Sequence, residues 1–180
     1  IEHYPTNYYS YNTTFSKNKL IKYIKNKRDY YSLTRKSILG WLVSIFYPNV
    51  KLNALSKINP QQKDKILDVG CGNGLLLQIM RGFGYSKSFG VDPFIKNDVY
   101  FENECMVHKQ ELSELKDNSN WDIVIAHHSI EHMPDQQSIL RATHNLLAPE
   151  GFFVIRIPLV SSFVWRKYGV NWYQIDAPRH

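Results

Sequence analysis

The chain has 180 residues, 43% of them hydrophobic, a size and composition that favour one globular domain with a buried core and exclude wholesale disorder. Its two cysteines, Cys71 and Cys105, exclude a disulfide framework, match no zinc-binding spacing and favour a reducing compartment. The formal net charge of +6 is concentrated between residues 17 and 36, where eight basic residues accompany one acid, so the basic character is local to the N-terminal part.

The first 60 residues predict an irregular arm followed by helices. A helix is expected from Ser16, which could cap it, and a second over residues 34–46, which must end before Pro48. The apolar run of the second helix is too short to span a bilayer, and no signal peptide is recognisable. Because the chain begins with Ile1 rather than Met, we expect a fragment of a longer protein.

The basic segment has three interpretations. In the preferred one, the helices pack across the mouth of a ligand site and the lysines form their solvated face. Residues 17–47 could instead make a weak contact with an anionic membrane surface, burying Trp41 and Phe46 in the interface. Nucleic acid is not expected as a partner, because basic and aromatic residues are interleaved here without any recognised nucleic-acid-binding module.

The stretch most informative about function is residues 65–74, KILDVGCGNG, in which an apolar run carries Asp68 and then breaks into glycines at every second position. An apolar helical pattern follows and should end near Gly82 or Gly84. The stretch predicts a strand, a tight loop against which a ligand can lie, and a helix whose N-terminus favours an anionic group. A dinucleotide-binding loop would require glycine where Leu75 stands, so an NAD-binding enzyme is a disfavoured alternative.

The string LDVGCGNG resembles motif I of the class I S-adenosylmethionine-dependent methyltransferases. In that family the glycine loop carries the methionine part of the cofactor. The resemblance therefore implies S-adenosylmethionine as the cofactor, with contacts from Asp68, Gly70, Cys71, Gly72 and Gly74.

A second strand is expected over residues 88–92 and ends in Asp92, 20 residues beyond Gly72. An acid at this position lies at the ligand-binding edge of a doubly wound sheet and can accept both ribose hydroxyls of a nucleoside. Pro93 and Phe94 follow and could cover the adenine face, with Phe94 the better candidate for stacking.

A short third strand is expected over residues 104–108, and a continuous apolar run over residues 121–126 predicts a buried fourth strand. Between them, Gln110 and Glu111 come directly after the third strand. The family often places polar contacts to the adenine amino group there, although the match to the family is loose at this point.

The stretch HHSIEHMPD, residues 127–135, resembles the family's turn after the fourth strand, and His127 joins the candidate cofactor contacts. The candidate catalytic residues are His128, Glu131, His132 and His180. A hydroxyl acceptor would benefit from a base whose pKa lies near neutrality, and histidine is suited to that role. Either of His128 and His132 could instead be a polar core residue.

If this turn is helical, His128, Glu131 and His132 share one face and could bind a divalent metal. Related methyltransferases, including ubiquinone-biosynthesis O-methyltransferases, bind Mg²⁺ with an acid-x-x-Glu-His arrangement. Here His128 replaces the first acid, and imidazole is a poor ligand for Mg²⁺. The preferred interpretation is that Glu131 and His132 brace the loop by hydrogen bonds and that no metal is bound.

A helix is expected with Pro134 in its first turn and an end before Pro149, followed by a fifth strand over residues 152–157. The last segment, residues 159–180, is dense in aromatic and polar side chains and has little period. Its Trp…Asp-Ala-Pro-Arg-His phrase resembles a bacterial subgroup associated with cell-surface polysaccharide enzymes. Such side chains suit a sugar or another polar acceptor; a surface loop with a few buried aromatics is the alternative.

The predicted fold is α/β, a Rossmann-like, doubly wound, mostly parallel sheet of about five strands in the order 3-2-1-4-5. We expect N-terminal helices covering the cofactor site (1–60), an S-adenosylmethionine-binding core (61–158) and a substrate-side segment (159–180). The family's C-terminal hairpin is missing from the sequence, so the fifth strand would be an open edge through which the chain could form a homodimer.

The predicted function is S-adenosylmethionine-dependent methylation of oxygen or nitrogen in a small polar acceptor, such as a saccharide or a lipid-linked intermediate. We expect a cytoplasmic protein that can lie peripherally on the inner face of the membrane. The alternatives are a cofactor-binding module without turnover, a truncated inactive enzyme and, less favoured, the NAD-binding enzyme.

Overall fold

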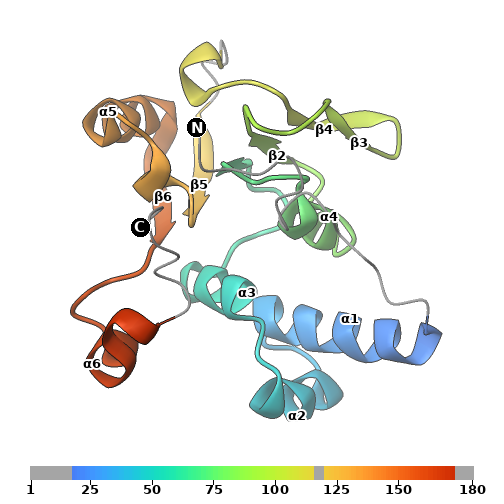
Figure 1. Ribbon diagram of the computed structural model, residues 1–180. Helices are drawn as coiled ribbons and strands as arrows, with labels where there is room; N and C mark the ends of the chain where they lie inside the picture. The colour runs from blue at the N-terminus through green and yellow to red at the C-terminus, as the bar shows by residue number, and fades with distance from the viewer. Residues whose placement is uncertain (1–17, 116–119, 173–180) are drawn as a thin grey trace.

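The computed structural model describes residues 18–115 and 120–172 and shows one mixed sheet flanked by helices (Figure 1). The strands are β1 (Ile66–Val69), β2 (Ser88–Val91), β3 (Val99–Phe101), β4 (Glu104–His108), β5 (Trp121–His127) and β6 (Leu147–Arg156). The helices are α1 (Lys19–Thr34), α2 (Ile38–Phe46), α3 (Val50–Leu55), α4 (Leu75–Arg81), α5 (Gln136–Leu146) and α6 (Phe163–Tyr168). Short 3-10 turns are η2 (Ser56–Ile58), η3 (Leu112–Glu114), η4 (Ile130–His132) and η5 (Gly169–Asn171). The sheet order is β3-β4-β2-β1-β5-β6, and every pairing is parallel except that of β3 with β4.

Helices cover both faces of the sheet, as a doubly wound fold requires. Figure 1 shows α1, α3 and α4 on one side of the sheet and α5 on the other. Leu33 of α1, Leu52 of α3 and Ile66 of β1 belong to one cluster of buried side chains. Leu67 of β1 belongs to a second cluster, which Ile139 of α5 covers. Successive residues of β1 therefore point into different halves of the core, and the whole strand is buried.

The predicted order of the five parallel strands is confirmed, but the sheet has one strand more than expected. β3 runs antiparallel to β4 and ends the sheet on that side. A two-residue turn joins these strands, and its residues Glu102 and Asn103 have positive φ angles of 49° and 67°. Such hairpin turns usually contain glycine. Because this one has none and β3 is three residues long, the sequence pattern did not predict the hairpin.

The N-terminal helices differ in their bounds from the predicted ones. Asn18 caps α1, since its Oδ1 accepts the Leu20 N–H at 2.9 Å. Arg35, with a left-handed φ of 61°, ends α1, so residues 34–37 do not belong to the second helix as predicted. The end of α2 at Phe46, before Pro48, is confirmed. α3 was not predicted, because six residues are too few to show a helical period.

α2 contacts α1 closely and leaves most of its apolar side chains in solvent. A Cβ on Gly40 would lie 2.1 Å from the Lys27 carbonyl oxygen, so this glycine permits the close approach of the two helices. On the outer side, Ile38 is 81% exposed and Phe46 is 77% exposed. None of the helices in the described ranges is long and apolar enough to cross a membrane.

The C-terminal elements also depart from their predicted bounds. Asp135 caps α5 through Oδ1, which accepts the Ser138 N–H at 2.9 Å, so Pro134 precedes the helix instead of opening it. β6 begins at Leu147 rather than at residue 152 and forms an end of the sheet. Its pairing with β5 shifts between Leu147 and Phe152, so Pro149 lies in an irregular stretch and regular pairing begins at Phe152. α6 lies in a segment for which no period was recognised.

Candidate active site at the carboxyl ends of the central strands

The glycine loop follows β1 and lies between two neighbouring elements. Gly70, Gly72 and Gly74 all have positive φ angles, of 73°, 57° and 71°. A Cβ on Gly70 would lie 2.4 Å from the Ser129 Cβ, and a Cβ on Gly74 would lie 2.6 Å from Val107 Cγ2. Backbone conformation and close packing thus both require glycine at these two positions. The alternating glycines set the loop at the edge where β1, β2 and β5 all end.

Asp92 follows β2 and is fixed against this loop. Its side chain is buried, and its Oδ2 accepts the Gly72 N–H at 2.7 Å. Its Oδ1 accepts the Phe94 N–H at 2.8 Å. Each carboxylate oxygen retains a second lone pair for a further donor. Phe94 itself is 53% exposed beside this acid, and Pro93 lies between the two. The structure therefore brings the predicted ribose and adenine residues together next to the glycine loop.

Asp68 is a second buried acid in the same place. It is 3% exposed, and its Oδ1 makes no hydrogen bond to the described residues. Burial raises the pKa of Asp68 to about 7, Lys51 opposes the rise, and Asp92 adds to it. A buried carboxyl group with an unpartnered oxygen is costly unless a donor or a cation reaches it. A ligand with a positively charged group would supply that partner.

Lys51 of α3 and Arg156 of β6 bring positive charge to the same strand ends. Lys51 is exposed as a residue, but many protein atoms surround its ammonium group. The resulting desolvation lowers the pKa of Lys51. The charge of Asp68 opposes this shift, and the charge of Arg156 adds to it. Arg156 Nη1 donates to His127 Nε2 at 2.8 Å, which leaves the His127 proton on Nδ1. Burial, then Lys51 and Arg156, lower the pKa of His127 to about 3. His127 is therefore a neutral group held by Arg156.

Sequence reasoning missed Lys51 and Arg156. Arg156 carried a signal, because it is the one cation in the apolar run 152–157 and stands where a parallel strand reaches the ligand-binding edge. Lys51 carried none, because its helix was not predicted and its approach to Asp68 depends on the packing of α3 against the sheet.

The loop after β5 is braced by hydrogen bonds. His128 has a left-handed φ of 54°, and its N–H donates to the Arg156 carbonyl oxygen at 2.9 Å. Its Nδ1 lies 3.3 Å from Glu131 Oε1. Ser129, another residue that sequence reasoning missed, is buried and donates its hydroxyl to the Val69 carbonyl oxygen at 2.7 Å. These contacts hold the loop directly against the glycine loop.

The helical face that would have placed His128, Glu131 and His132 side by side, the condition for the disfavoured metal alternative, is not formed. η4 contains Ile130–His132, and His128 lies outside it in left-handed conformation. In the part of the chain that the structure describes, the three side chains do not gather their ligand atoms into a metal-binding group. The contact between His128 and Glu131 supports the bracing interpretation.

His128 nevertheless has the geometry of a general base. When its Nδ1–H donates to Glu131, its Nε2 is left as a proton acceptor. This Nε2 and Glu131 Oε2 are buried and find no hydrogen-bond partner in the described ranges. Burial alone would raise the pKa of Glu131, but the hydrogen bond from His128, a backbone hydrogen bond and the charges of His132 and His128 together lower it. An ionised Glu131 would orient the ring and stabilise its protonated form.

The remaining predicted site residues have different surroundings. Glu111 caps η3 in a reciprocal pair with Glu114, which occupies its side chain. Gln110 directly precedes this turn, close to the end of β4. Cys71 packs into the space over Gly90, and burial raises the pKa of its thiol, so it is a neutral packing group. His180 lies outside the described residues.

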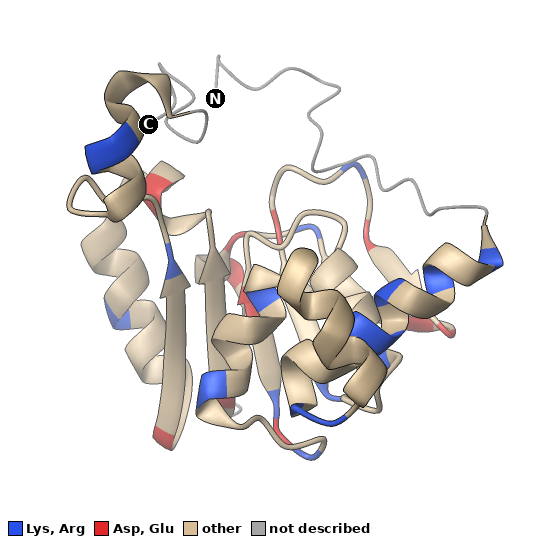
Figure 2. Ribbon diagram, turned by 90° about the horizontal axis from the view of Figure 1, so that it is seen from below, with Lys and Arg blue, Asp and Glu red and all other residues tan. Residues whose placement is uncertain are grey.

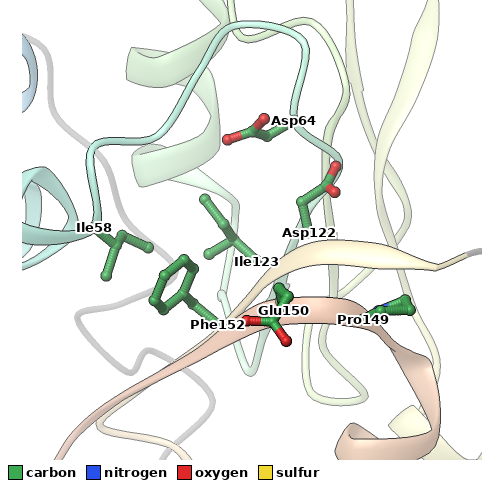
Figure 3. Close-up of a pocket in the computed structure, with 8 residues that line it drawn as sticks. Ile58, Asp64, Asp122, Ile123, Pro149, Glu150 and Phe152 are labelled. Carbon is green, nitrogen blue, oxygen red and sulfur yellow. The ribbon is translucent and has the colours of Figure 1, made fainter.

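A pocket of about 260 Å³ lies at the other edge of the sheet, near the amino ends of β5 and β6 (Figure 3). Acidic residues line it, but Asp64 Oδ2 accepts the Gln61 N–H at 2.7 Å and Asp122 Oδ2 accepts the Lys65 N–H at 2.8 Å. These carboxylates stabilise the chain entering β1. The pocket is on the opposite edge from the glycine loop and has no part in the candidate site.

The profile of the family described as "Methyltransferase domain" matches residues 48–180. The chain is 30% identical over 124 residues to a ubiquinone biosynthesis O-methyltransferase of Neisseria meningitidis serogroup C, a match that covers 56% of this chain and 51% of that protein. A ubiquinone biosynthesis O-methyltransferase of a Shewanella species is 31% identical over 101 residues, covering 49% of this chain and 41% of that protein. The chain thus spans about half the length of the curated relatives it matches.

A solved structure from Thermotoga maritima, described as a SAM-dependent methyltransferase and possible histamine N-methyltransferase, has a similar fold. Its TM-score is 0.52 at 16% sequence identity, and the match covers 85% of this chain and 70% of that chain. At this identity the likeness concerns the fold alone. The family profile, by contrast, includes the glycine loop, both buried acids and every strand of the sheet. This chain therefore belongs to the Methyltransferase domain family, whose cofactor is S-adenosylmethionine.

Proposed function

We propose that this chain transfers the methyl group of S-adenosylmethionine to an oxygen atom of a small polar acceptor. The observation that carries the proposal is the pair of buried acids around the glycine loop. Asp92 is held in place by the Gly72 N–H, and Asp68 has an oxygen without a partner among the described residues. Transfer to oxygen draws its support from the curated relatives, which are named O-methyltransferases.

The residues present suit the cofactor group by group. Asp92 would accept the ribose hydroxyls, and Phe94 with Pro93 would cover the adenine. The amino-acid end of the cofactor carries both charges, and the opposite charges of Asp68 and Lys51 suit its ammonium and its carboxylate. The positive-φ glycines leave room for this end to lie against the backbone.

The bound cofactor supplies a methyl group on a sulfonium, which is already activated toward nucleophiles. The protein's own contribution is then mainly alignment of the acceptor oxygen with the methyl group. His128 Nε2 would take the proton of the acceptor hydroxyl, while Glu131 holds the imidazole from Nδ1. Because this Nε2 is buried, the acceptor must displace part of the covering chain to reach it.

A surface on the N-terminal helices supports one class of acceptor. The basic–apolar surface consists of exposed lysines on and after α1 and exposed apolar side chains on and after α2: Lys19, Lys22, Lys25, Lys36, Ile38, Leu39, Trp41, Leu42, Ile45, Phe46 and Tyr47. Figure 2 shows lysine and arginine along α1. Apolar side chains beside cations suit the boundary of an anionic membrane. This surface favours a lipid-linked intermediate over a free saccharide as acceptor, with the chain lying on the inner face of the membrane.

Calorimetric titration with S-adenosylmethionine, S-adenosylhomocysteine and NAD tests the cofactor site. We expect binding of the first two in the micromolar range and a loss of about 100-fold in Asp92→Asn, because charge-assisted hydrogen bonds to the ribose are removed. Asp135→Asn is the matched control, since asparagine caps α5 as well as aspartate does. Unchanged affinity in Asp92→Asn, or binding of NAD alone, contradicts the proposal.

A further inference from the structure

Three side chains outside the candidate active site point at one another at the β3–β4 edge of the sheet. Asp98 directly precedes β3, and Cys105 and His108 lie on β4. Cys105 Sγ is 3.4 Å from His108 Nδ1 and 3.8 Å from Asp98 Oδ2. His108 Nδ1 is 3.7 Å from Asp98 Oδ2. One sulfur, one nitrogen and one oxygen thus form a nearly equilateral triangle.

These separations match those of ligands around a tetrahedral ion. Bonds of about 2.0 Å to nitrogen and oxygen and about 2.3 Å to sulfur, at tetrahedral angles, put the donor atoms roughly 3.3 to 3.6 Å apart. The observed distances exceed these by a few tenths of an ångström at most. A small movement of the side chains would therefore complete the coordination.

A β-bulge explains how Cys105 and His108 reach the same side. Residues three apart on a regular strand point to opposite faces. Here Val99 pairs with Val107 and Tyr100 pairs with Cys105, so β4 has one residue more than β3 in this interval. The extra residue of β4 shifts the alternation of its side chains, and Met106 and Val107 are both buried. Cys105 and His108 are consequently left together at the surface.

The backbone holds Asp98 ready for such a role. Its Oδ1 accepts the Lys109 N–H at 2.8 Å, which turns Oδ2 toward Cys105 and His108. The hairpin itself is closed by a turn of two residues, so Asp98 and β4 have little freedom to separate.

The same three residue types also make nucleophilic triads, but this geometry differs from a triad. A histidine that relays a proton uses one ring nitrogen toward the cysteine and the other toward the acid. In this hairpin both Cys105 and Asp98 approach the same atom, His108 Nδ1. Convergence on one point is the arrangement of a metal site.

We propose that Asp98, Cys105 and His108 bind a single Zn²⁺ ion, with water as the fourth ligand. A set of sulfur, nitrogen and oxygen donors favours zinc over the hard ions magnesium and calcium. The ion would tie β3 to β4 and so stabilise the small core beneath, in which Val99 and Phe101 cover Met106 and Val107. It would also fix the end of β4, where the His108 carbonyl oxygen accepts the Asp92 N–H at 3.1 Å.

The test uses the chain without a histidine tag after treatment with a chelator that is then removed. Titration with Zn²⁺ should show one equivalent bound, and Co²⁺ should give the absorption band of a thiolate–cobalt bond. In Cys71→Ser this band must persist, because Cys105 is then the only thiol in the chain. Cys105→Ser should abolish it, and His108→Ala or Asp98→Asn should weaken Zn²⁺ binding at least about tenfold. His144→Ala on α5 is a control that should not change the affinity.

Thermal unfolding gives a second readout that does not depend on the cofactor. Zn²⁺ should raise the melting temperature of the wild type and of Cys71→Ser, but not that of Cys105→Ser. A folded wild-type chain that binds no Zn²⁺, or one whose binding survives in Cys105→Ser and His108→Ala, overturns the proposal. Because the cobalt band of Cys71→Ser identifies the thiol, the proposal remains testable even if a ligand variant does not fold.

Discussion

At the residue scale, Asp68 gives the protein a pH dependence with a definite sign. Its pKa rises from 3.8 to about 7 on folding, chiefly through burial, so between these values the folded state binds more protons than the unfolded state. Stability contributed by this residue is therefore highest below pH 4, falls as the pH rises, and is level above pH 7. The difference is roughly 4 kcal/mol in total. Denaturant unfolding from pH 4 to 8 should show the free energy of unfolding of the wild type falling by about this amount relative to that of Asp68→Asn as the pH rises.

The comparison with Asp68→Asn is needed because His127 acts in the opposite direction. Its pKa is lowered to about 3, chiefly by burial, so stability that it contributes is lost as the pH falls below its unfolded value of 6.5. The free energy of unfolding of the wild type changes with pH through both residues. The difference in free energy of unfolding between wild type and Asp68→Asn isolates the contribution of Asp68. A difference that does not change with pH would contradict the raised pKa.

Lys51 carries the second prediction at this scale. Lys51→Met keeps most of the apolar stem and removes the charge near Asp68. If Lys51 binds the cofactor carboxylate, affinity for S-adenosylmethionine and S-adenosylhomocysteine should fall about tenfold. Lys57→Met, an exposed lysine on the next turn of the same segment, should leave both affinities within a factor of about two. Equal effects of the two substitutions in calorimetry would remove Lys51 from the site.

Site residues differ in how far the sequence could predict them. Asp68 and Asp92 were predictable, because each lies within one residue of the carboxyl end of a buried parallel strand, and such ends share one edge of the sheet. Lys51, Ser129 and Arg156 enter the site through contacts between elements far apart in the chain. The grouping of Asp98, Cys105 and His108 depends on a bulge, and a bulge changes which residues share a face without changing composition.

At the scale of the element, the strand–loop–helix unit depends on glycine for two reasons that can be separated. Gly74 has a left-handed backbone, with φ of 71° and ψ of 29°, and no room for a Cβ. The backbone conformation alone should cost Gly74→Ala about 1 kcal/mol. Overlap of the new Cβ with Val107 and Met106 should raise the loss to about 2–4 kcal/mol. Denaturant unfolding measures the loss, and one of no more than about 1 kcal/mol would contradict the packing argument.

Elements that were predicted and elements that were missed differ in length and burial. β1 and β5 were visible as apolar runs, because both faces of a central strand are covered. α4 was visible because it also is mostly apolar and buries Leu76, Leu77 and Met80. β3, α3 and α6 have three to six residues, too few to show a period of their own. α3 is held by the packing of Leu52 and Leu55, whereas α6 buries no side chain and is capped by Ser162. The fifth strand was predicted only from residue 152, where its regular pairing with β5 begins; Pro149 belongs to an irregular first part of β6, which a strand pattern does not reveal.

At the scale of the whole molecule, β6 ends the sheet within the described residues, and its outer edge has no paired strand there. Phe152 and Ile155 of this strand are 49% and 43% exposed. A second copy of the chain could pair along this edge, and we keep a homodimer as a proposal. Light scattering that finds a monomer at high concentration would argue against it.

The basic–apolar surface gives the last prediction. We expect the chain to bind vesicles that contain anionic lipid. The exposed aromatic and aliphatic side chains of α2 would be buried in the membrane boundary, and the lysines of α1 would lie near the anionic headgroups. Co-sedimentation should fall steeply as salt rises, because the lysine contribution is screened. Phe46→Ser should weaken partitioning about tenfold by removing buried apolar area. Tyr100→Ser, which changes an exposed aromatic residue on β3 away from this surface, should have little effect. Two outcomes would contradict membrane binding by the N-terminal helices: equal binding to neutral and anionic vesicles, or equal effects of the two substitutions. Either outcome would also remove the support for a lipid-linked acceptor.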